Sequence, residues 1–231
     1  MHNGEYFGKG ALTQKAPYGS TVNKAKNIVI IGYGGFAKEV RWLIDRINVI
    51  EPVWNFLGYV DRIGQGEDVV GDDSFIQNYS QELYVVIAIG DPAKRKQVYD
   101  KIKSNKNLVF PNLVDPSAIA SDGVSMGEGN VVCAGCVFTV DITVGSFNIF
   151  NLNCTIGHDV VIENYIIVEP NCNISGNCHV KSETDIGTGT QVIQGLTIGS
   201  KSIIGAGAVV ISDIEGNCTA VGVPAKVIKK V

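Results

Sequence analysis

The second half of the chain carries an apolar residue at every sixth position without interruption. The 15 residues in this phase are Met126, Val132, Phe138, Val144, Phe150, Ile156, Ile162, Val168, Ile174, Val180, Ile186, Val192, Ile198, Ile204 and Val210. Since 45% of the chain is apolar, such a run does not arise by chance. Three hexapeptides make one triangular turn of a parallel β-helix, with each sixth residue in the core. The repeat predicts an all-β parallel β-helix over residues 112–215, followed by a tail at 216–231.

Four of the six cysteines share one inward position of this repeat. Cys136, Cys154 and Cys172 are 18 residues apart, which is one full turn, and Cys178 occupies the same position on another side. The spacing predicts a buried column of small apolar thiols. Cys133 and Cys136 form a lone CxxC without a second pair, so a metal or redox role is the weaker interpretation.

Residues 27–111 have a different pattern, in which apolar strands alternate with helices. An apolar strand at 28–31 leads through a glycine-rich turn into an amphipathic helix at 36–50. Further strands are expected at 53–60, 69–70 and 84–89, with helices near 74–79 and after Gly90-Asp91-Pro92. Such alternation favours a parallel sheet, here a small Rossmann-like α/β domain.

Residues 1–26 are polar and aperiodic, and we interpret them as a leader, natural or left by cloning, with disorder as one possible state. The segment lacks the apolar core of a secretion signal, and no apolar run approaches the roughly 18 residues of a membrane span. We therefore expect a cytoplasmic protein. Residues 1–111 carry 14 basic and 12 acidic side chains, and residues 112–215 carry 2 and 11. Without a basic stripe, nucleic acid is not an expected partner.

The hexapeptide array, with Ile204-Gly-Ala-Gly-Ala-Val-Val210 and Val221-Gly-Val-Pro-Ala-Lys226, resembles the hexapeptide-repeat sugar O-/N-acyltransferases. The segment Asn27-Ile-Val-Ile-Ile-Gly-Tyr-Gly-Gly-Phe-Ala-Lys-Glu-Val40 in front of it is similar to one branch. That branch holds bacterial nucleotide-amino-sugar N-acetyltransferases and sialic-acid O-acetyltransferases. The resemblance implies a left-handed coil and a homotrimer with active sites between protomers. It also implies acetyl-CoA as co-substrate in the groove between coils, a nucleotide-linked amino sugar on the N-terminal domain, and no metal.

Acyl transfer from a thioester needs a base for the attacking group and a donor for the oxyanion. The segment Asn151-Leu-Asn-Cys-Thr-Ile-Gly-His158 matches the family pattern, which implies that His158 is the general base and that Asp159 orients it. Of the other histidines, His2 lies in the leader and His179 is interpreted as structural. Some relatives carry a second histidine where this chain has Ile167, so that contact is lost or supplied otherwise.

The resemblance also implies a set of ligand-binding residues. Ser175 and Gly176 match the segment that holds the thioester carbonyl, and Gly187 and Ala206 match positions in the pantetheine groove. On the sugar side, the glycines of the Gly32-Tyr-Gly-Gly35 turn are candidates for phosphate binding at a helix N-terminus. The remaining candidates for the nucleotide sugar are Gly34, Asp61, Arg62, Gly90 and Asn151. Relatives more often have two acids where this chain has Asp61-Arg62, so the nucleotide stays open.

The leading hypothesis is transfer of acetyl from acetyl-CoA to the amine of a nucleotide-linked amino-deoxysugar, with a UDP-4-amino sugar favoured, in bacterial surface-glycan biosynthesis. The alternative within the class is O-acetylation of a hydroxyl, as on sialic acid. A γ-type carbonic anhydrase would need three histidine ligands, and only two are available outside the leader. An NAD-dependent oxidoreductase would need a longer dinucleotide fold than about 85 residues. A non-catalytic nucleotide-sugar binder is the remaining class.

Overall fold

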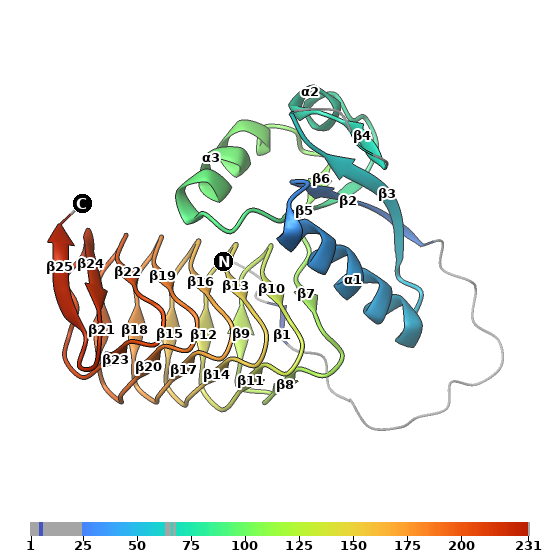
Figure 1. Ribbon diagram of the computed structural model, residues 1–231. Helices are drawn as coiled ribbons and strands as arrows, with labels where there is room; N and C mark the ends of the chain where they lie inside the picture. The colour runs from blue at the N-terminus through green and yellow to red at the C-terminus, as the bar shows by residue number, and fades with distance from the viewer. Residues whose placement is uncertain (1–4, 7–24, 63–65, 67, 231) are drawn as a thin grey trace.

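The computed structural model describes residues 5–6, 25–62, 66 and 68–230, so most of the predicted leader lies outside the described residues. A small α/β domain sits on one flank of a long coil of short strands, over its N-terminal turns (Figure 1). In the leader, β1 (Glu5–Tyr6) pairs antiparallel with the first strand of one coil face. None of the described helices combines the length and hydrophobicity needed to cross a membrane.

The α/β domain is built on a five-stranded parallel sheet of order β4-β3-β2-β5-β6. Its strands are β2 (Lys26–Ile31), β3 (Trp54–Val60), β4 (Val69–Gly71), β5 (Leu83–Ile87) and β6 (Leu108–Val109). Its helices are α1 (Gly35–Ile50), α2 (Asp73–Gln77) and α3 (Pro92–Ile102). The apolar face of α1 packs on one side of the sheet and α2 and α3 cover the other. The predicted Rossmann-like arrangement is confirmed.

The coil presents three parallel sheets, which we call face 1, face 2 and face 3 in chain order. Face 1 comprises β7 (Leu113–Val114), β10 (Val131–Val132), β13 (Ile149–Phe150), β16 (Ile167–Val168), β19 (Asp185–Ile186), β22 (Ile203–Ile204) and β24 (Cys218–Val221). Face 2 comprises β8 (Ile119–Ala120), β11 (Val137–Phe138), β14 (Thr155–Ile156), β17 (Asn173–Ile174), β20 (Gln191–Val192) and β23 (Val209–Val210). Face 3 comprises β9 (Ser125–Met126), β12 (Thr143–Val144), β15 (Val161–Ile162), β18 (His179–Val180) and β21 (Thr197–Ile198). At the far end β25 (Lys226–Lys230) pairs antiparallel with β24.

Successive strands on each face are in register at intervals of 18 residues, for example Phe138 opposite Ile156. The hexad residues from Met126 to Val210 are all buried in one continuous core, which confirms the predicted β-helix. The cysteines are buried as well. The Sγ of Cys136 lies 3.0 Å from the Asn151 carbonyl oxygen, and the Sγ of Cys154 lies 3.2 Å from that of Glu169. Each thiol thus donates to the next turn, which gives the column a packing role.

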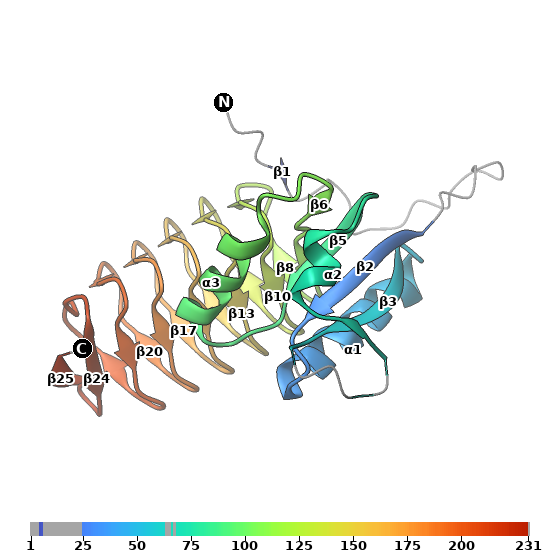
Figure 2. The same ribbon diagram turned by 90° about the horizontal axis from the view of Figure 1, so that it is seen from above.

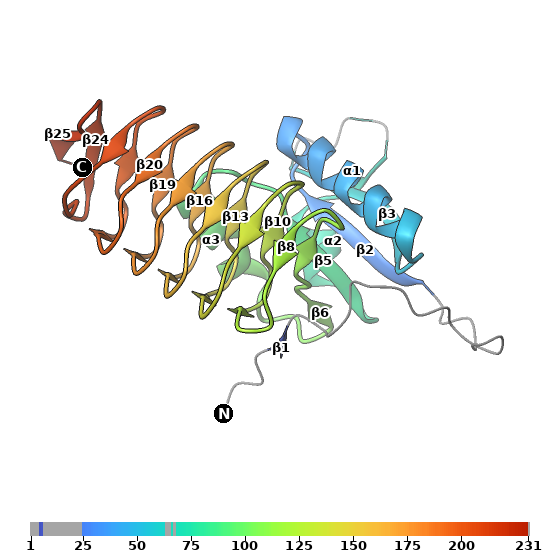
Figure 3. The same ribbon diagram turned by 90° about the horizontal axis from the view of Figure 1, so that it is seen from below.

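The α/β domain docks on face 1 of the coil. The outward residues of this face, Leu113, Val131, Ile149 and Ile167, are buried in one cluster with the sheet and α1. Helix α3 lies beside the coil turns that carry β13 and β16 (Figure 2), and α1 lies along its N-terminal turns (Figure 3). Elements β3–β6 fall within residues 27–111 and β7–β23 within 112–215, while the division into these ranges and a tail stays a prediction.

Candidate active site

We name the edges of the coil after the faces they join: edge 1–2 (as in residues 151–154), edge 2–3 (157–160) and edge 3–1 (163–166). His158 and Asp159 lie on edge 2–3, which is the vertex opposite face 1. The Nδ1 of His158 is 2.8 Å from the Oδ2 of Asp159. This carboxylate favours the tautomer with its proton on Nδ1, which leaves Nε2 as the basic nitrogen. Half of the His158 side chain is exposed, so a substrate can reach it.

Gly176 lies one turn further along the same edge, directly beside the His158 ring. A Cβ at Gly176 would overlap with Nε2, Cε1 and Cδ2 of the imidazole, so only glycine leaves the ring its place. The backbone N–H of Gly176 donates to no acceptor in the part of the chain that the structure describes. Ser175 precedes it on the exposed surface. The structure thus brings the predicted base together with the segment predicted to hold the thioester carbonyl.

The glycine turn between β2 and α1 joins two different kinds of glycine. Gly32 has φ of +113°, and a Cβ there would lie 2.9 Å from the Ala88 carbonyl oxygen, so the turn itself requires glycine. At Gly34 and Gly35 a Cβ would meet nothing within 4 Å. Gly34 is the N-cap of α1, without a side-chain cap and without an acid in the first turn. The free N–H groups there suit an anion.

The other predicted sugar-side residues lie at the same edge of the sheet. Asp61 follows β3, and its backbone N–H donates to the Gly71 carbonyl at 3.0 Å. The Nη2 of Arg62 is 3.3 Å from the Oδ2 of Asp73. Gly90 lies beyond the end of β5, and a Cβ there would contact the Cδ1 of Ile167 on face 1 at 3.6 Å. The carboxyl edge of the sheet, where such folds bind ligands, therefore faces the middle turns of face 1.

Asn151, Gly187 and Ala206 lie where face 1 passes into edge 1–2. Asn151 is 9% exposed, and its Nδ2 donates to the Oε2 of Glu169 at 3.2 Å. A Cβ at Gly187 would lie 2.6 Å from the Ile204 carbonyl oxygen and 2.7 Å from the Ala206 amide nitrogen. Close packing of adjacent turns accounts for this glycine without a ligand.

The predicted site residues therefore form two groups on opposite sides of one chain. The sheet edge, Asn151, Gly187 and Ala206 lie on the side of face 1 and edge 1–2, whereas His158, Asp159, Ser175 and Gly176 lie on edge 2–3. Face 2 and the body of the coil separate the groups. A single chain does not bring them together.

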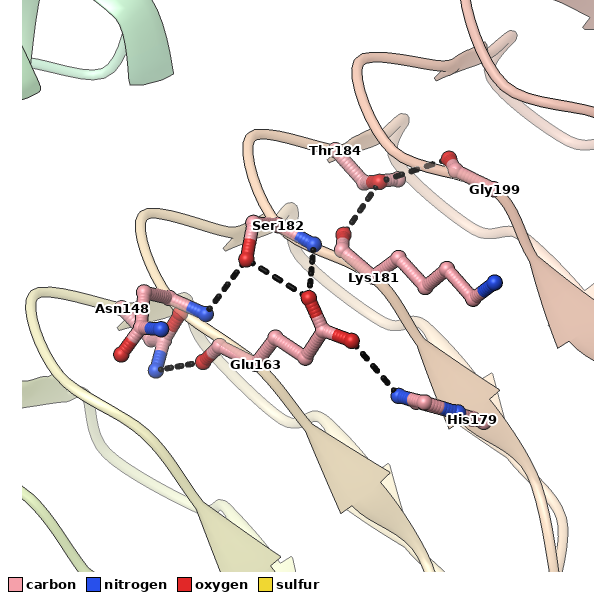
Figure 4. Close-up of polar contacts among 8 residues, drawn as sticks. Asn148, Glu163, His179, Lys181, Ser182, Thr184 and Gly199 are labelled. Atoms are coloured by element: carbon pink, nitrogen blue, oxygen red, sulfur yellow. Dashed lines mark hydrogen bonds and ion pairs between the residues drawn. The ribbon is translucent and has the colours of Figure 1, made fainter.

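His179 takes part in a separate network on face 3 (Figure 4). Its Nε2 is 2.8 Å from the Oε1 of Glu163, whose Oε2 accepts from the Ser182 N–H at 3.0 Å and from the Ser182 hydroxyl at 2.7 Å. These hydrogen bonds lower the pKa of Glu163 against the opposing effect of its burial. The network ties adjacent turns together, which supports the structural interpretation of His179.

Within the described residues, no three His, Cys, Asp or Glu side chains converge as metal ligands would. Burial raises the pKa of the Cys133 thiol to about 12, so the CxxC cysteine nearest the surface of face 1 stays protonated.

Comparison with known proteins follows from this geometry. Residues 27–102 match the PglD N-terminal domain family. PerB from Caulobacter crescentus, solved in complex with CoA and GDP-perosamine, is 31% identical and superposes with a TM-score of 0.80, over 88% of this chain and 97% of PerB. The chain belongs to the hexapeptide-repeat sugar acetyltransferases.

Two other members of this acetyltransferase family have the same architecture. The acetyltransferase domain of PglB from Neisseria gonorrhoeae FA1090 is 28% identical over 88% of this chain and all of that domain, with a TM-score of 0.83. WeeI from Acinetobacter baumannii AYE is 26% identical over 88% and 100%, with a TM-score of 0.78. A search of curated protein sequences finds no match. The predicted family and the enzyme class, a sugar N-acetyltransferase, are confirmed.

Proposed function

We propose that this acetyltransferase transfers the acetyl group of acetyl-CoA to the amine of a nucleotide-linked amino-deoxysugar, with a UDP-linked 4-amino sugar as the favoured acceptor, for a bacterial surface glycan. The observation that carries the proposal is the His158–Asp159 pair, with Nε2 held beside Gly176. PerB, a family member, was solved with CoA and GDP-perosamine, which makes the GDP sugar the main competitor of the UDP sugar.

In the proposed reaction, the Nε2 of His158 accepts a proton from the attacking amine as the C–N bond forms. Asp159 holds the imidazole in the required tautomer and stabilises its protonated form. The free N–H of Gly176 is available to the oxyanion of the tetrahedral intermediate. Collapse of that intermediate breaks the C–S bond, and the protonated His158 returns its proton to the CoA thiolate. No acyl-enzyme is needed, because the thioester is already activated.

We place the pyrophosphate of the acceptor at the N-terminus of α1, against Gly34 and Gly35, where the N–H groups lack partners in their own helix. Asp61, Arg62 and Gly90 border the same space at the carboxyl edge of the sheet. Asn151 lies between this edge and the coil, where its amide is oriented by Glu169.

A homotrimer supports this chemistry, because a neighbouring coil supplies what one chain lacks. Around edge 2–3, beside His158, four large apolar side chains are exposed, as expected of a surface that another protein covers. They are Val140 at 48%, Val161 at 39%, Ile193 at 45% and Ile211 at 50%. In this arrangement His158 of one protomer faces the sugar-binding edge of the next, and acetyl-CoA lies between Ser175-Gly176 of one coil and Gly187 and Ala206 of the other.

The direct test is release of CoA thiol from acetyl-CoA with a panel of acceptors. The panel holds UDP-, GDP- and dTDP-linked 3-amino and 4-amino deoxysugars and free sialic acid. We expect turnover with a nucleotide amino sugar, its loss in His158→Ala, and an acetamide product by mass spectrometry. Turnover with sialic acid alone would move the protein to O-acetylation, and a His158→Ala variant with most of its turnover would contradict the assigned base.

A further inference from the structure

Arg95, in the first turns of α3, is buried at the junction of the two domains. Only 1% of the residue is exposed. Its Nε donates to the Phe147 carbonyl at 2.9 Å, and its Nη2 donates to the Ile166 carbonyl at 3.2 Å. Both acceptors belong to edge 3–1 of the coil, on successive turns.

The same guanidinium also holds the loop that follows β5. Its Nη1 donates to the carbonyls of Ile89 at 2.6 Å and Gly90 at 2.7 Å. One side chain therefore joins the sugar-binding edge of the α/β domain to two turns of the coil. Only the planar five-donor fork of arginine covers so many acceptors at once.

No carboxylate forms an ion pair with this cation among the described residues. Burial lowers the pKa of Arg95 to about 10, while Asp91 and Asp185 oppose the shift from a distance, so the group is still charged at neutral pH. A buried charge is costly unless it is well hydrogen-bonded. An apolar side chain would join the domains at lower cost, but it would not fix carbonyl positions.

We propose that Arg95 is a positioning residue, which sets the height and angle of the Gly90 loop over the coil and so aims the bound amino sugar at the base. The inference rests on the proposed function. Arg95 touches neither substrate, and it acts through the loop at Ile89–Gly90. Because acetyl-CoA is assigned to the coils alone, its binding does not depend on this junction.

The test compares Arg95→Met and Arg95→Lys with the wild-type enzyme, well below their melting temperatures. We expect Arg95→Met to raise KM for the nucleotide sugar and to lower kcat, each by about 10-fold. The Kd of acetyl-CoA, measured by calorimetry, should stay within about twofold of wild type. Arg95→Lys should recover part of the loss, because its ammonium reaches some of the four carbonyls.

Arg46→Met is the matched control. It breaks the other buried polar link between the domains, where the Arg46 Nε lies 2.6 Å from the Asp115 Oδ2, far from the Gly90 loop. This variant should melt earlier with unchanged kinetic constants. If the Arg95 variants also lost only thermal stability, the positioning role would be wrong. A wild-type enzyme silent toward every amino sugar would instead contradict the proposed function. If Arg95→Met fails to fold, Arg95→Lys carries the comparison.

Discussion

The imidazole of His158 occupies the space above Gly176 that any side chain at that position would need. The two residues are one coil turn apart, so the repeat itself places them in contact. The rest of edge 2–3 could accept larger residues at this position, since Asn, Ile and Leu occur at comparable places on neighbouring turns. The glycine thus serves the histidine.

Gly176→Ala should displace the His158 ring while leaving the coil folded. We expect kcat to fall by about 10- to 100-fold, because a shift of about 1 Å in a reacting group has effects of that size. Steady-state kinetics and thermal melting measure the two parts. The double variant with His158→Ala should be no slower than His158→Ala alone, since both changes act on one ring. Additive losses would show that Gly176 acts independently of the histidine.

Gly34→Asp should separate stability from binding. Aspartate is a favoured N-cap residue and complements the helix dipole, so α1 and the melting temperature should be unharmed or slightly raised. The same carboxylate would repel a pyrophosphate, and we expect KM for the nucleotide sugar to rise at least about 10-fold. Gly34→Asn keeps the cap without the charge and should have a much smaller effect. Equal KM values for the two variants would argue against a phosphate at this helix terminus.

Two inactive variants should restore activity when they assemble together. Co-expression of His158→Ala and Gly34→Asp gives mixed trimers that each hold one intact site. A statistical mixture should recover about one quarter of wild-type activity, because three quarters of the trimers are mixed and one site in three is intact in each. Size-exclusion chromatography with light scattering gives the assembly state. Mixed trimers without activity would place the whole site within one chain.

Asp185 makes stability depend on pH. Burial and the nearby Glu169 raise the pKa of this carboxyl to about 6, with Arg95 opposing them. Between the unfolded pKa of about 3.9 and the folded value, the native state binds more protons, so ionisation of Asp185 removes stability as pH rises through this window. Asp185→Asn should therefore raise the melting temperature at pH 8 and have a smaller effect near pH 4. A stabilisation independent of pH would show that the carboxyl titrates normally.

The interior of the coil was predictable because burial is written into every sixth residue. The docking of the α/β domain left a weaker signal in the same repeat. On face 1 the outward positions Leu113, Val131, Ile149 and Ile167 are apolar at intervals of 18, whereas the matching positions on face 3 include Ser125, Thr143 and Thr197. That contrast marks the covered face, and it becomes visible only when the hexads are sorted by face.

Arg95 could not be found in this way. It stands between two lysines in a polar helix, and nothing in its neighbours distinguishes it from a solvated side chain. Its acceptors are backbone carbonyls as far as 71 residues away, and a carbonyl leaves no mark on residue identity. The separation of the sugar edge from His158 was likewise hidden, because it depends on which vertex of the triangle each segment reaches.

The 18-residue register turns residue number into height. Each full turn advances the chain by about 4.8 Å, the spacing between neighbouring strands, so the base and every groove residue occupy fixed rungs of one ladder. A single inserted residue would carry all later side chains around the triangle to the wrong face. A family built in this way can lengthen its cofactor-facing wall only by whole turns, and its catalytic rung stays where it is while the ladder grows beyond it.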